Sequence, residues 1–579
     1  MYFSTLLALP IFFQAPASDA AATSPAPAAD GQLAIRAVER MAALPQPLAV
    51  RDWAAFAKVY YQQILNPAAA GDGFPAVRVD ADRPGFFMKS YLGGPMDGES
   101  LTCLSAVAGA RLAGLDPRDL DGVDYVARSK AWYDPSTGIY RHRVGERSPE
   151  VSADIYGYWA AIQGMILAAQ YPDDGDFKQQ ALQAVKAFKA IAQGVGCPDH
   201  PNFDGLGWNF ATQQPGGRSE PMNRLGHAPS VAWMLLAGNA LTGDKTLDDY
   251  ARSTMHWYSK HPGRYELSHV MGPLVAARLN AAGGEPLDMN AIFNAWFGDG
   301  AWAQHTWQVT AGRVIDGVTY DGLDGAWWGT EGAFYTFTMG SLQGPAWLVP
   351  VARYDSRYAR AIARYALHAA NSASYLTGLG LDAKHQDHSA WKSKWDPKNM
   401  LFYEGLRSWS PSEDRKLQPY ATGDNAKEGW YNGKGRIAPN DYLAQKAAWI
   451  ENTPANISLY MGNHIGYLGG ILQLTDVAGI LSWDCVATDW FHPPAYPTRL
   501  VFNPHPEAKT VVLDLGAKPV DLYDTVQKKF IGAGRKGLYR LNLAADTAAV
   551  IVSIPAGTPI AYQDGRVMAG GTVVDWRAQ

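Results

Sequence analysis

Four segments of the chain are apolar on almost every face of the helix that each predicts. They cover residues 99–115, 154–171, 227–241 and 456–474. A helix of this kind has no polar face to turn toward water, so it is normally buried on all sides. We therefore expect these four segments to form inner helices that the rest of the protein encloses.

A second kind of helix alternates with these inner helices. Each of the first three apolar segments ends in a short polar turn, such as "TGDK" at 242–245, and an amphipathic segment follows. In the segment after Asp176, apolar residues recur at helical spacing: Phe177, Ala181, Ala184, Phe188 and Ile191. Two further helix pairs cover 267–282 with 287–297 and 344–354 with 356–370. The alternation predicts about six helical hairpins, each with one buried and one half-buried helix.

The pattern changes to a period of two near the C-terminus. Short alternating runs separated by Gly, Pro and Asp occupy 498–504, 509–515, 520–525, 538–543 and 548–555. Runs of this length and spacing are typical of β-strands. We predict a small β-sandwich over 495–579 that follows a helical domain over 23–494. A β-like stretch at 306–337 interrupts the helices, and we expect a β-hairpin insertion there.

The helical part resembles an (α/α)₆ toroid, the fold of many glycoside hydrolases and polysaccharide lyases. The resemblance covers about residues 32–489 and is carried by the alternation and by turns such as "ALTGDKTLDDYARSTMHW" at 240–257. It implies six inner helices that run the same way, so that their N-termini open onto one mouth. A helical solenoid is the alternative, and the irregular hairpin spacing argues against a strict repeat array.

Composition narrows the function. The formal net charge is -5 and no long run of Lys and Arg is present, which argues against a nucleic-acid binder. The 20 Trp and 29 Tyr residues often lie beside Gly in predicted loops, where their rings suit flat apolar ligands such as sugars. The 3 Cys residues are too few for a disulfide framework or a zinc cluster. Because His385 and His388 have no partner cluster, we expect neither a metal nor another cofactor.

The N-terminus predicts export. Residues 1–22 contain a short apolar run followed by small residues, which resembles a signal peptide cut after Ala20, Ala21 or Ala22. A basic n-region is missing, and a disordered apolar tail is the alternative. Since no other stretch is long and apolar enough to span a bilayer, we expect a periplasmic or secreted protein.

Polar residues gather at the predicted starts of the inner helices. Asp97 and Glu99 precede the first, Asp154 and Tyr156 open the second, Arg224 and His227 open the third, and Tyr460, Asn463 and His464 lie early in the last. In a toroid these side chains border the mouth. Helix capping is the alternative for Asp97 and Asp154.

The segment 320–336 is the densest in carboxylates and aromatic rings. It carries Asp321, Asp324 and Glu331 around Trp327 and Trp328. Glycoside hydrolysis needs one carboxyl that stays protonated and a second that ionises, and apolar rings raise the pKa of the first. A turn-rich hairpin with solvated carboxylates is the alternative. Asp204, Asp424 and Glu428 are further acidic candidates on Gly-rich loops.

These observations favour a glycoside hydrolase that acts on a poly- or oligosaccharide. We predict Asp154 and Glu331 as the acid/base pair, with Asp204 as a third candidate. The predicted sugar-binding residues are Glu99, Tyr156, Trp208, Arg224, His227, Trp327, Trp328, Tyr460, Asn463 and His464.

Two other functions stay open. A polysaccharide lyase would use Asn223, Arg224 and His227, or Asn463, His464 and Tyr467, to neutralise a uronate and move its C5 proton. A non-catalytic glycan-binding protein would need the rings but no paired carboxylates. The sequence does not specify the sugar, the linkage, endo or exo action, retention or inversion, or the oligomeric state.

Overall fold

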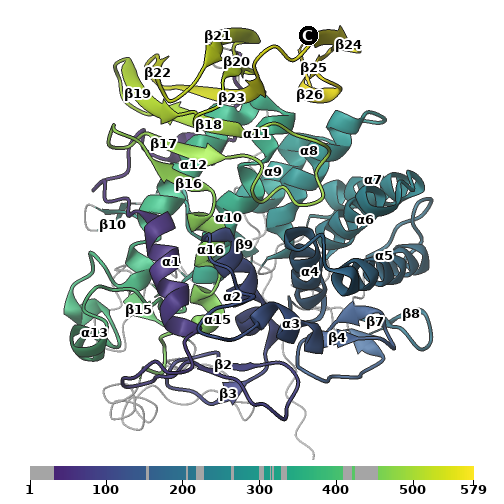
Figure 1. Ribbon diagram of the computed structural model, residues 1–579, viewed down its shortest axis with the longest axis vertical. Helices are drawn as coiled ribbons and strands as arrows, with labels where there is room; N and C mark the ends of the chain where they lie inside the picture. The colour runs from purple at the N-terminus through teal and green to yellow at the C-terminus, as the bar shows by residue number, and fades with distance from the viewer. Residues whose placement is uncertain are drawn as a thin grey trace, which may run out of the picture.

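The computed structural model describes residues 31–151, 155–203, 207–216, 227–262, 267–298, 306–312, 314–315, 318–327, 335–407, 420–423 and 454–578. It is a mainly helical body followed by a C-terminal β domain (Figure 1). In that view the strands of the β domain, in yellow, lie over the end of the helical body opposite α15 and the short strands β2 and β3.

The buried helices contact one another in a closed series. They are α2 (Ser100–Leu112), α4 (Ile155–Gln170), α6 (Ala228–Thr242), α8 (Gly272–Ala282), α10 (Thr338–Leu348), and α15 (Leu459–Gly462) with α16 (Ile465–Gly469). A 3₁₀ turn, η3 (Ser268–Met271), leads into α8. Each helix contacts the next one in the series: α2 contacts α4, α4 contacts α6, α6 contacts α8, α8 contacts α10, and α10 contacts α16. The series closes because α16 contacts α2. The predicted burial of the four apolar segments is confirmed in all of them.

Outer helices cover this series. They are α1 (Trp53–Ile64), α3 (Tyr125–Ser129), α5 (Gly175–Gly194), α7 (Thr246–Lys260), α9 (Met289–Phe297) and α12 (Ala359–Ser372). The predicted apolar face of α5 is buried along its whole length. In contrast, α12 was expected to be half-buried and is almost entirely buried, because strands of the β domain pack on its outer side.

The last predicted inner helix is interrupted. The apolar pattern at 456–474 predicts one helix, but α15 ends at Gly462, α16 ends at Gly469, and residues 472–474 form strand β16 (Leu472–Leu474). The close approach of α16 to α2 explains the glycines there. A Cβ added at Gly466 would lie 2.2 Å from the carbonyl oxygen of Gly109, a position that no side chain tolerates.

The stretch at 306–337 is a hairpin in its first part only. Strand β9 (Thr306–Val309) pairs with β12 (Asp324–Trp327), and β10 (Val314–Ile315) pairs with β11 (Val318–Thr319) between them. Strand β13 (Tyr335–Phe337) instead joins a separate sheet with β14 (Gly405–Arg407) and β15 (Tyr420–Thr422).

Short strands also border the helical body. They are β1 (Val77–Arg78), β2 (Phe87–Lys89) and β3 (Met96–Asp97) in one sheet, β4 (Tyr133–Asp134) with β5 (Ile139–Tyr140) in a second, and β6 (Glu150–Val151), β7 (Gly207–Asn209) and β8 (Gln214–Gly216) in a third.

The C-terminal domain has two packed layers. One is a six-stranded antiparallel sheet in the order β16, β17 (Leu481–Asp484), β18 (Thr498–Asn503), β23 (Thr547–Pro555), β20 (Val520–Asp524) and β21 (Lys529–Arg535). The other is the pair β19 (Lys509–Asp514) and β22 (Leu538–Leu543). Apolar side chains of both layers form one buried cluster, as in a β-sandwich. Because β16 and β17 join the sheet, it begins before residue 495.

A smaller sheet follows near the end of the chain. It consists of β24 (Ile560–Gln563), β25 (Arg566–Ala569) and β26 (Thr572–Asp575).

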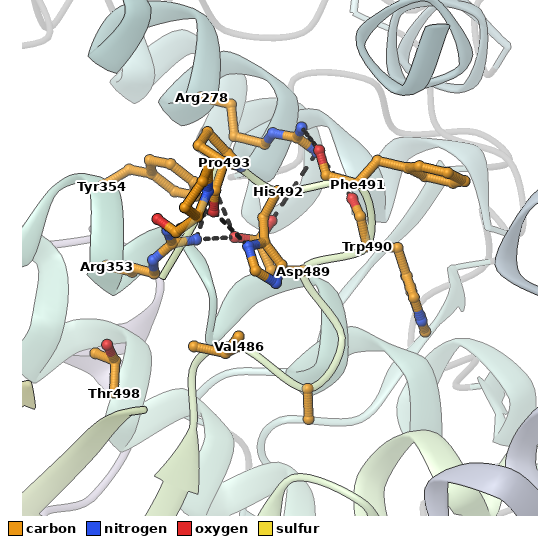
Figure 2. Close-up of polar contacts among 12 residues, drawn as sticks. Arg278, Arg353, Tyr354, Val486, Asp489, Trp490, Phe491, His492, Pro493 and Thr498 are labelled. Atoms are coloured by element: carbon orange, nitrogen blue, oxygen red, sulfur yellow. Dashed lines mark hydrogen bonds and ion pairs between the residues drawn. The ribbon is translucent and has the colours of Figure 1, made fainter. Parts of the chain in front are cut away.

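A buried charge cluster fastens the segment between β17 and β18 to the helices. Asp489 accepts hydrogen bonds from Arg353 Nη1 at 2.6 Å and from the Tyr354 hydroxyl at 2.7 Å, both in α11 (Val351–Tyr354). Arg278 of α8 lies 4.0 Å from the same carboxylate and donates to the carbonyls of Trp490 and Phe491. Figure 2 shows these groups around Asp489, with the rings of Trp490 and Phe491 directed away from it.

Those two rings extend the attachment into the helical core. Trp490 packs on Trp347 of α10 at 5.2 Å between ring centroids, and Phe491 packs on Trp233 of α6 at 6.0 Å. The connection between the domains is therefore both ionic and apolar.

Candidate functional site

The starts of the inner helices meet one another. The carbonyl of Ser90 accepts backbone hydrogen bonds from Leu459 and Tyr460 at the start of α15, while its hydroxyl contacts Glu99 and Thr102 at the start of α2. Similar contacts join the starts of α15 and α4 (Tyr460 with Tyr156) and of α4 and α6 (Tyr158 with His227). His269 of η3 meets Asp324 of β12, whose backbone N–H donates to Ser341 near the start of α10. The N-terminal ends of these helices therefore share one side of the helical body.

Glu99 lies in the middle of this side. The Ser90 hydroxyl donates to Glu99 Oε2 at 2.6 Å, and His142 Nε2 lies 3.5 Å from Oε1. The backbone N–H of Glu99 donates to Asp97 Oδ1 at 3.0 Å, so Asp97 fixes the main chain just ahead of α2. Glu99 is the N-cap residue of α2, but its carboxylate caps no backbone N–H and remains available for other chemistry.

Burial keeps this carboxyl protonated up to neutral pH. Only 8% of Glu99 is exposed. Desolvation by burial raises its pKa from 4.5 to about 7, aided by the nearby negative charge of Asp97 and opposed by the Ser90 hydrogen bond and by Arg143. A carboxylic acid that titrates near pH 7 can donate a proton to a substrate at the pH of most biological fluids.

Two stacked tyrosines lie beside Glu99. The rings of Tyr156 and Tyr460 stack at 6.3 Å between centroids, and their hydroxyl oxygens are 3.4 Å apart. The ring of His142 meets that of Tyr156 edge-on at 4.6 Å. Since His142 also approaches Glu99, one imidazole links the carboxyl to the aromatic pair. An acid beside aromatic rings is an arrangement that suits a sugar.

A second buried carboxylate contacts Tyr91, the residue that follows Ser90. The Tyr91 hydroxyl donates to Glu404 Oε2 at 2.9 Å, and Glu404 is 2% exposed. A Cβ added at Gly423 would lie 2.8 Å from Glu404 Oε2 and 2.9 Å from Asn456 Oδ1, so these polar atoms crowd one small space. Ser90 therefore contacts Glu99, and the next residue along the chain, Tyr91, contacts Glu404.

Hydrogen bonds hold this second group in place. Asn456 Nδ2 donates to Asp387 Oδ2 at 2.7 Å, and the Thr422 hydroxyl donates to the same oxygen. The backbone N–H of Asn456 donates to His388 Nε2 at 2.9 Å. His388, which the sequence left without a partner cluster, is buried and accepts this hydrogen bond.

The structure brings together three of the predicted site residues: Glu99, Tyr156 and Tyr460. His227 is 3% exposed and stacks on Tyr158 at 4.5 Å, and burial lowers its pKa to about 3, which keeps it neutral. His227 is therefore a neutral, buried residue that packs on α4.

Three other predicted sugar-binding residues are buried against neighbouring elements. Asn463 Nδ2 donates to the carbonyl of Thr102 at 2.7 Å, and His464 Nδ1 lies 2.5 Å from the side-chain nitrogen of Gln343. Trp208 is 2% exposed and packs on Gly194 at the end of α5. Their contact with a sugar stays a prediction.

Asp321 and Tyr467 are described and fully buried, whereas the other predicted residues lie outside the described part of the chain. They are the catalytic candidates Asp154, Asp204 and Glu331, the binding candidates Arg224 and Trp328, Asn223 of the lyase set, and the acidic candidates Asp424 and Glu428. Trp327 is the last residue of β12, but the structure does not describe its side chain. Asp324 is described: it is fully buried, and its Oδ2 lies 3.6 Å from His269 Nε2.

Sequence reasoning missed His142, Tyr91, Glu404 and Asp387. No helix start or periodic pattern marks their positions. The only available signal was local, a single carboxylate within an apolar run, as in "LFYEGL" at 401–406. A buried acid of this kind is paired or functional more often than not.

Among the described residues no group of three or more His, Cys, Asp and Glu side chains could hold a metal ion. The three cysteines, Cys103, Cys197 and Cys485, are buried and free. None of the helices that the structure describes combines the length and apolarity needed to cross a membrane.

Comparison with known proteins gives distant likenesses only. No protein-family model and no curated protein matches the chain. Among solved structures it is similar to Ara127N, described as a GH127 β-L-arabinofuranosidase from Geobacillus stearothermophilus T6, with 11% identity and a TM-score of 0.34 over 91% of this chain and 85% of that one.

It is also similar to BT3674, described as a GH127 β-arabinofuranosidase, with 12% identity and a TM-score of 0.30 over 94% of this chain and 85% of that one. Both neighbours are thus described as arabinofuranosidases of GH127. Similarity at this level carries no argument about activity, which must come from the chain's own residues.

Proposed function

We propose that this protein is a glycoside hydrolase of poly- or oligosaccharides and that Glu99 is its general acid. The observation that carries the proposal is the Glu99 carboxyl, which is buried, has a pKa of about 7 and lies beside the stacked rings of Tyr156 and Tyr460. Glycosidic oxygens are poor leaving groups unless they are protonated as the bond breaks, and a positioned acid supplies that proton.

We further propose Glu404 as the second carboxylate. The Tyr91 hydroxyl donates to Glu404, and the hydroxyl of the preceding residue, Ser90, donates to Glu99, so adjacent residues of the chain each hold one acid. A carboxyl separation of about 5 to 5.5 Å would make Glu404 a nucleophile, and one of about 6.5 to 9.5 Å would make it a base that activates water. The sequence-predicted acids Asp154, Glu331 and Asp204 remain the alternatives for this role.

The closed series of buried helices supports an (α/α)₆ toroid as the catalytic domain, which would extend from residue 23 to the start of the β-sandwich at β16. We also propose that residues 1–22 direct export to the periplasm or the medium, because of their apolar and small-residue pattern.

One observation favours a second candidate function, a polysaccharide lyase. The hydroxyls of Tyr156 and Tyr460 lie 3.4 Å apart, and His142 contacts the first ring. Paired tyrosines beside a histidine could remove a C5 proton and protonate the leaving oxygen. The buried Glu99 has no role in that chemistry, and for this reason hydrolysis comes first.

The roles proposed for the two carboxylates can be tested separately, because they predict a different dependence of activity on the leaving group of the substrate. Glu99→Gln should lower kcat/KM on an unactivated glycoside by about 10²–10⁴-fold, the usual contribution of general acid catalysis. On an aryl glycoside whose phenolate leaves without protonation, the same variant should keep most of its activity. Glu285→Gln, in a side chain that is 79% exposed, is the matched control.

Glu404 gives the complementary result. Glu404→Ala should lose activity on both substrates, and azide should restore turnover if this carboxylate is the nucleophile or the base. Full activity of Glu99→Gln on the unactivated glycoside would remove Glu99 from the mechanism and return the acid role to Asp154 or Glu331.

A further inference from the structure

Four half-exposed arginines lie on one side of the site. They are Arg78, Arg83, Arg143 and Arg147, whose side chains are 46%, 52%, 55% and 47% exposed. We call this group the basic rim. It contrasts with the chain as a whole, whose formal net charge is -5.

Contacts between apolar side chains bring these arginines together. The guanidinium groups of Arg78 and Arg83 lie over the Phe87 ring, 5.3 and 4.5 Å from its centroid. The side chains of Phe87 and Val144 meet at Gly98, where an added Cβ would lie 3.4 Å from the first and 3.0 Å from the second. Since Arg143 precedes Val144, the basic rim is continuous from β1 to the segment after β5.

Arg143 is the member nearest to Glu99. The two residues form an isolated antiparallel bridge, and the carbonyl of His142 accepts the backbone N–H of Ser100 at 2.8 Å. The carboxylate of Glu146 accepts the backbone N–H of Arg143 at 3.1 Å, which closes a turn. The main chain of Arg143 is therefore fixed against the start of α2, while its side chain projects toward solvent.

The basic rim has fewer counter-charges than guanidinium groups. Asp80 is shared, at 3.3 Å from Arg78 and 3.6 Å from Arg83. Asp134, 3.7 Å from Arg147, is fully buried and already accepts hydrogen bonds from Ser136 and Thr137. The last pair, Arg143 with Asp97, is 4.0 Å apart.

The guanidinium of Arg143 consequently donates no hydrogen bond to any residue that the structure describes. An exposed ion pair at this distance is worth little, so a better acceptor can displace Asp97 at small cost. A planar guanidinium matches a carboxylate or a sulfate ester, to which it can donate two parallel hydrogen bonds.

We infer that the basic rim binds oxyanions of an acidic glycan and that Arg143 holds the oxyanion nearest to the bond that is cleaved. This inference rests on the proposed function, because it takes Glu99 as the acid beside that bond. The recognised group is a uronate carboxylate or a sulfate ester, which share the same chemistry. The preferred substrate is then an acidic poly- or oligosaccharide.

A binding measurement tests this inference independently of catalysis. Full-length Glu99→Gln protein would be titrated calorimetrically with a polyuronate, with its carboxyl-reduced neutral form, and with a sulfated glycan and its desulfated form. We expect at least one acidic polymer to bind about tenfold or more tightly than its neutral counterpart, with affinity that falls as NaCl is raised. If the polyuronate shows this preference, the recognised oxyanion is a carboxylate; if the sulfated glycan shows it, the oxyanion is a sulfate ester.

Three variants in the same background assign the effect. Arg143→Gln should weaken binding of the acidic polymer about tenfold and leave the neutral one unchanged, as expected for the loss of a charge-assisted hydrogen bond. Asp97→Asn should tighten acidic binding because it removes the competing carboxylate, a change that a merely structural arginine would not produce. Arg535→Gln, an exposed position in β21 of the C-terminal domain, is the charge-matched control.

The outcomes are distinct. Equal affinity for acidic and neutral polymers, no binding of any acidic polymer, or an Arg143→Gln variant that binds like its parent would each overturn the inference. Cleavage of a neutral glycan that is indifferent to Arg143 overturns the inference and leaves the proposed hydrolase intact. If the protein binds an acidic glycan through Arg143 but the unmodified protein never cleaves any glycan, the proposed hydrolase is overturned and oxyanion binding by the basic rim stands.

Discussion

Replacing Glu99 by Gln should make the protein more stable at alkaline pH. The reason is the raised pKa of Glu99, about 7 in the folded chain against an ordinary value of 4.5. Between these two values the folded state holds a proton that the unfolded state releases. Folding stability therefore falls as pH rises from about 4.5 to about 7, and the full penalty is present above pH 7.

The size of the penalty follows from the shift. One pKa unit corresponds to about 1.4 kcal/mol, so burial of this carboxyl costs about 3 kcal/mol once it is ionised. Gln has a similar shape and no charge to desolvate at any pH. The two proteins should be similarly stable near pH 4.5, and Glu99→Gln should be more stable by about 3 kcal/mol near pH 8.

The assay is urea unfolding at a series of pH values from 4.5 to 8.5, followed by tryptophan fluorescence. The quantity of interest is the difference in unfolding free energy between Glu99→Gln and the unmodified protein. Glu285→Gln, whose side chain is 79% exposed, should give a difference close to zero throughout. A difference for Glu99→Gln that does not change with pH would refute the raised pKa and with it the argument for a protonated acid in the site.

Three further predictions concern the fold. Asp489→Ala leaves Arg353 buried without its partner and should lower the free energy of unfolding by about 3–5 kcal/mol in urea titration, whereas the exposed Asp119→Ala should change little. A result for Asp489→Ala within about 1 kcal/mol of that control would show that the ion pair does not fasten the two domains. Gly466→Ala should cost about 3 kcal/mol in the same assay, because its Cβ would overlap the Gly109 backbone, while Gly175→Ala meets no atom within 4 Å and should be neutral. Equal stabilities of these two variants would contradict the close packing of α16 on α2. The three cysteines are buried, and burial raises the pKa of each thiol, so they should react with a thiol reagent only after denaturation; rapid labelling of the native protein would contradict their burial.

The helical pattern was predictable where one physical cause dominates. Apolar residues at helical spacing in α5 are all on its buried face, because nothing but that face contacts the neighbouring helices. The pattern was a poorer guide where two causes compete. In α12 the face that sequence assigned to solvent is covered by strands of the C-terminal domain, and in α16 the contact with α2 requires glycine at 466 whatever the apolar pattern.

The site was predictable only in part. Glu99, Tyr156 and Tyr460 were found because each lies at a helix start, a position that sequence can recognise. Glu404 was missed because its place depends on long-range backbone pairing: its N–H donates to the carbonyl of Asn456, and its carbonyl accepts from Thr338. Sequence predicted Glu99 as a binding residue and gave no reason to propose it as an acid, because the burial that raises its pKa comes from packing that no local pattern reveals.

The central claim is tested most directly by digesting a panel of glycans with the purified protein. The panel would include neutral glucans, mannans and galactans together with uronate polymers, and each digest would be read for reducing ends and for the ultraviolet absorbance of an unsaturated product. We expect reducing ends without absorbance, and a large loss of those reducing ends in Glu99→Gln. Reducing ends accompanied by absorbance would contradict hydrolysis and establish the lyase that Tyr156, Tyr460 and His142 could support.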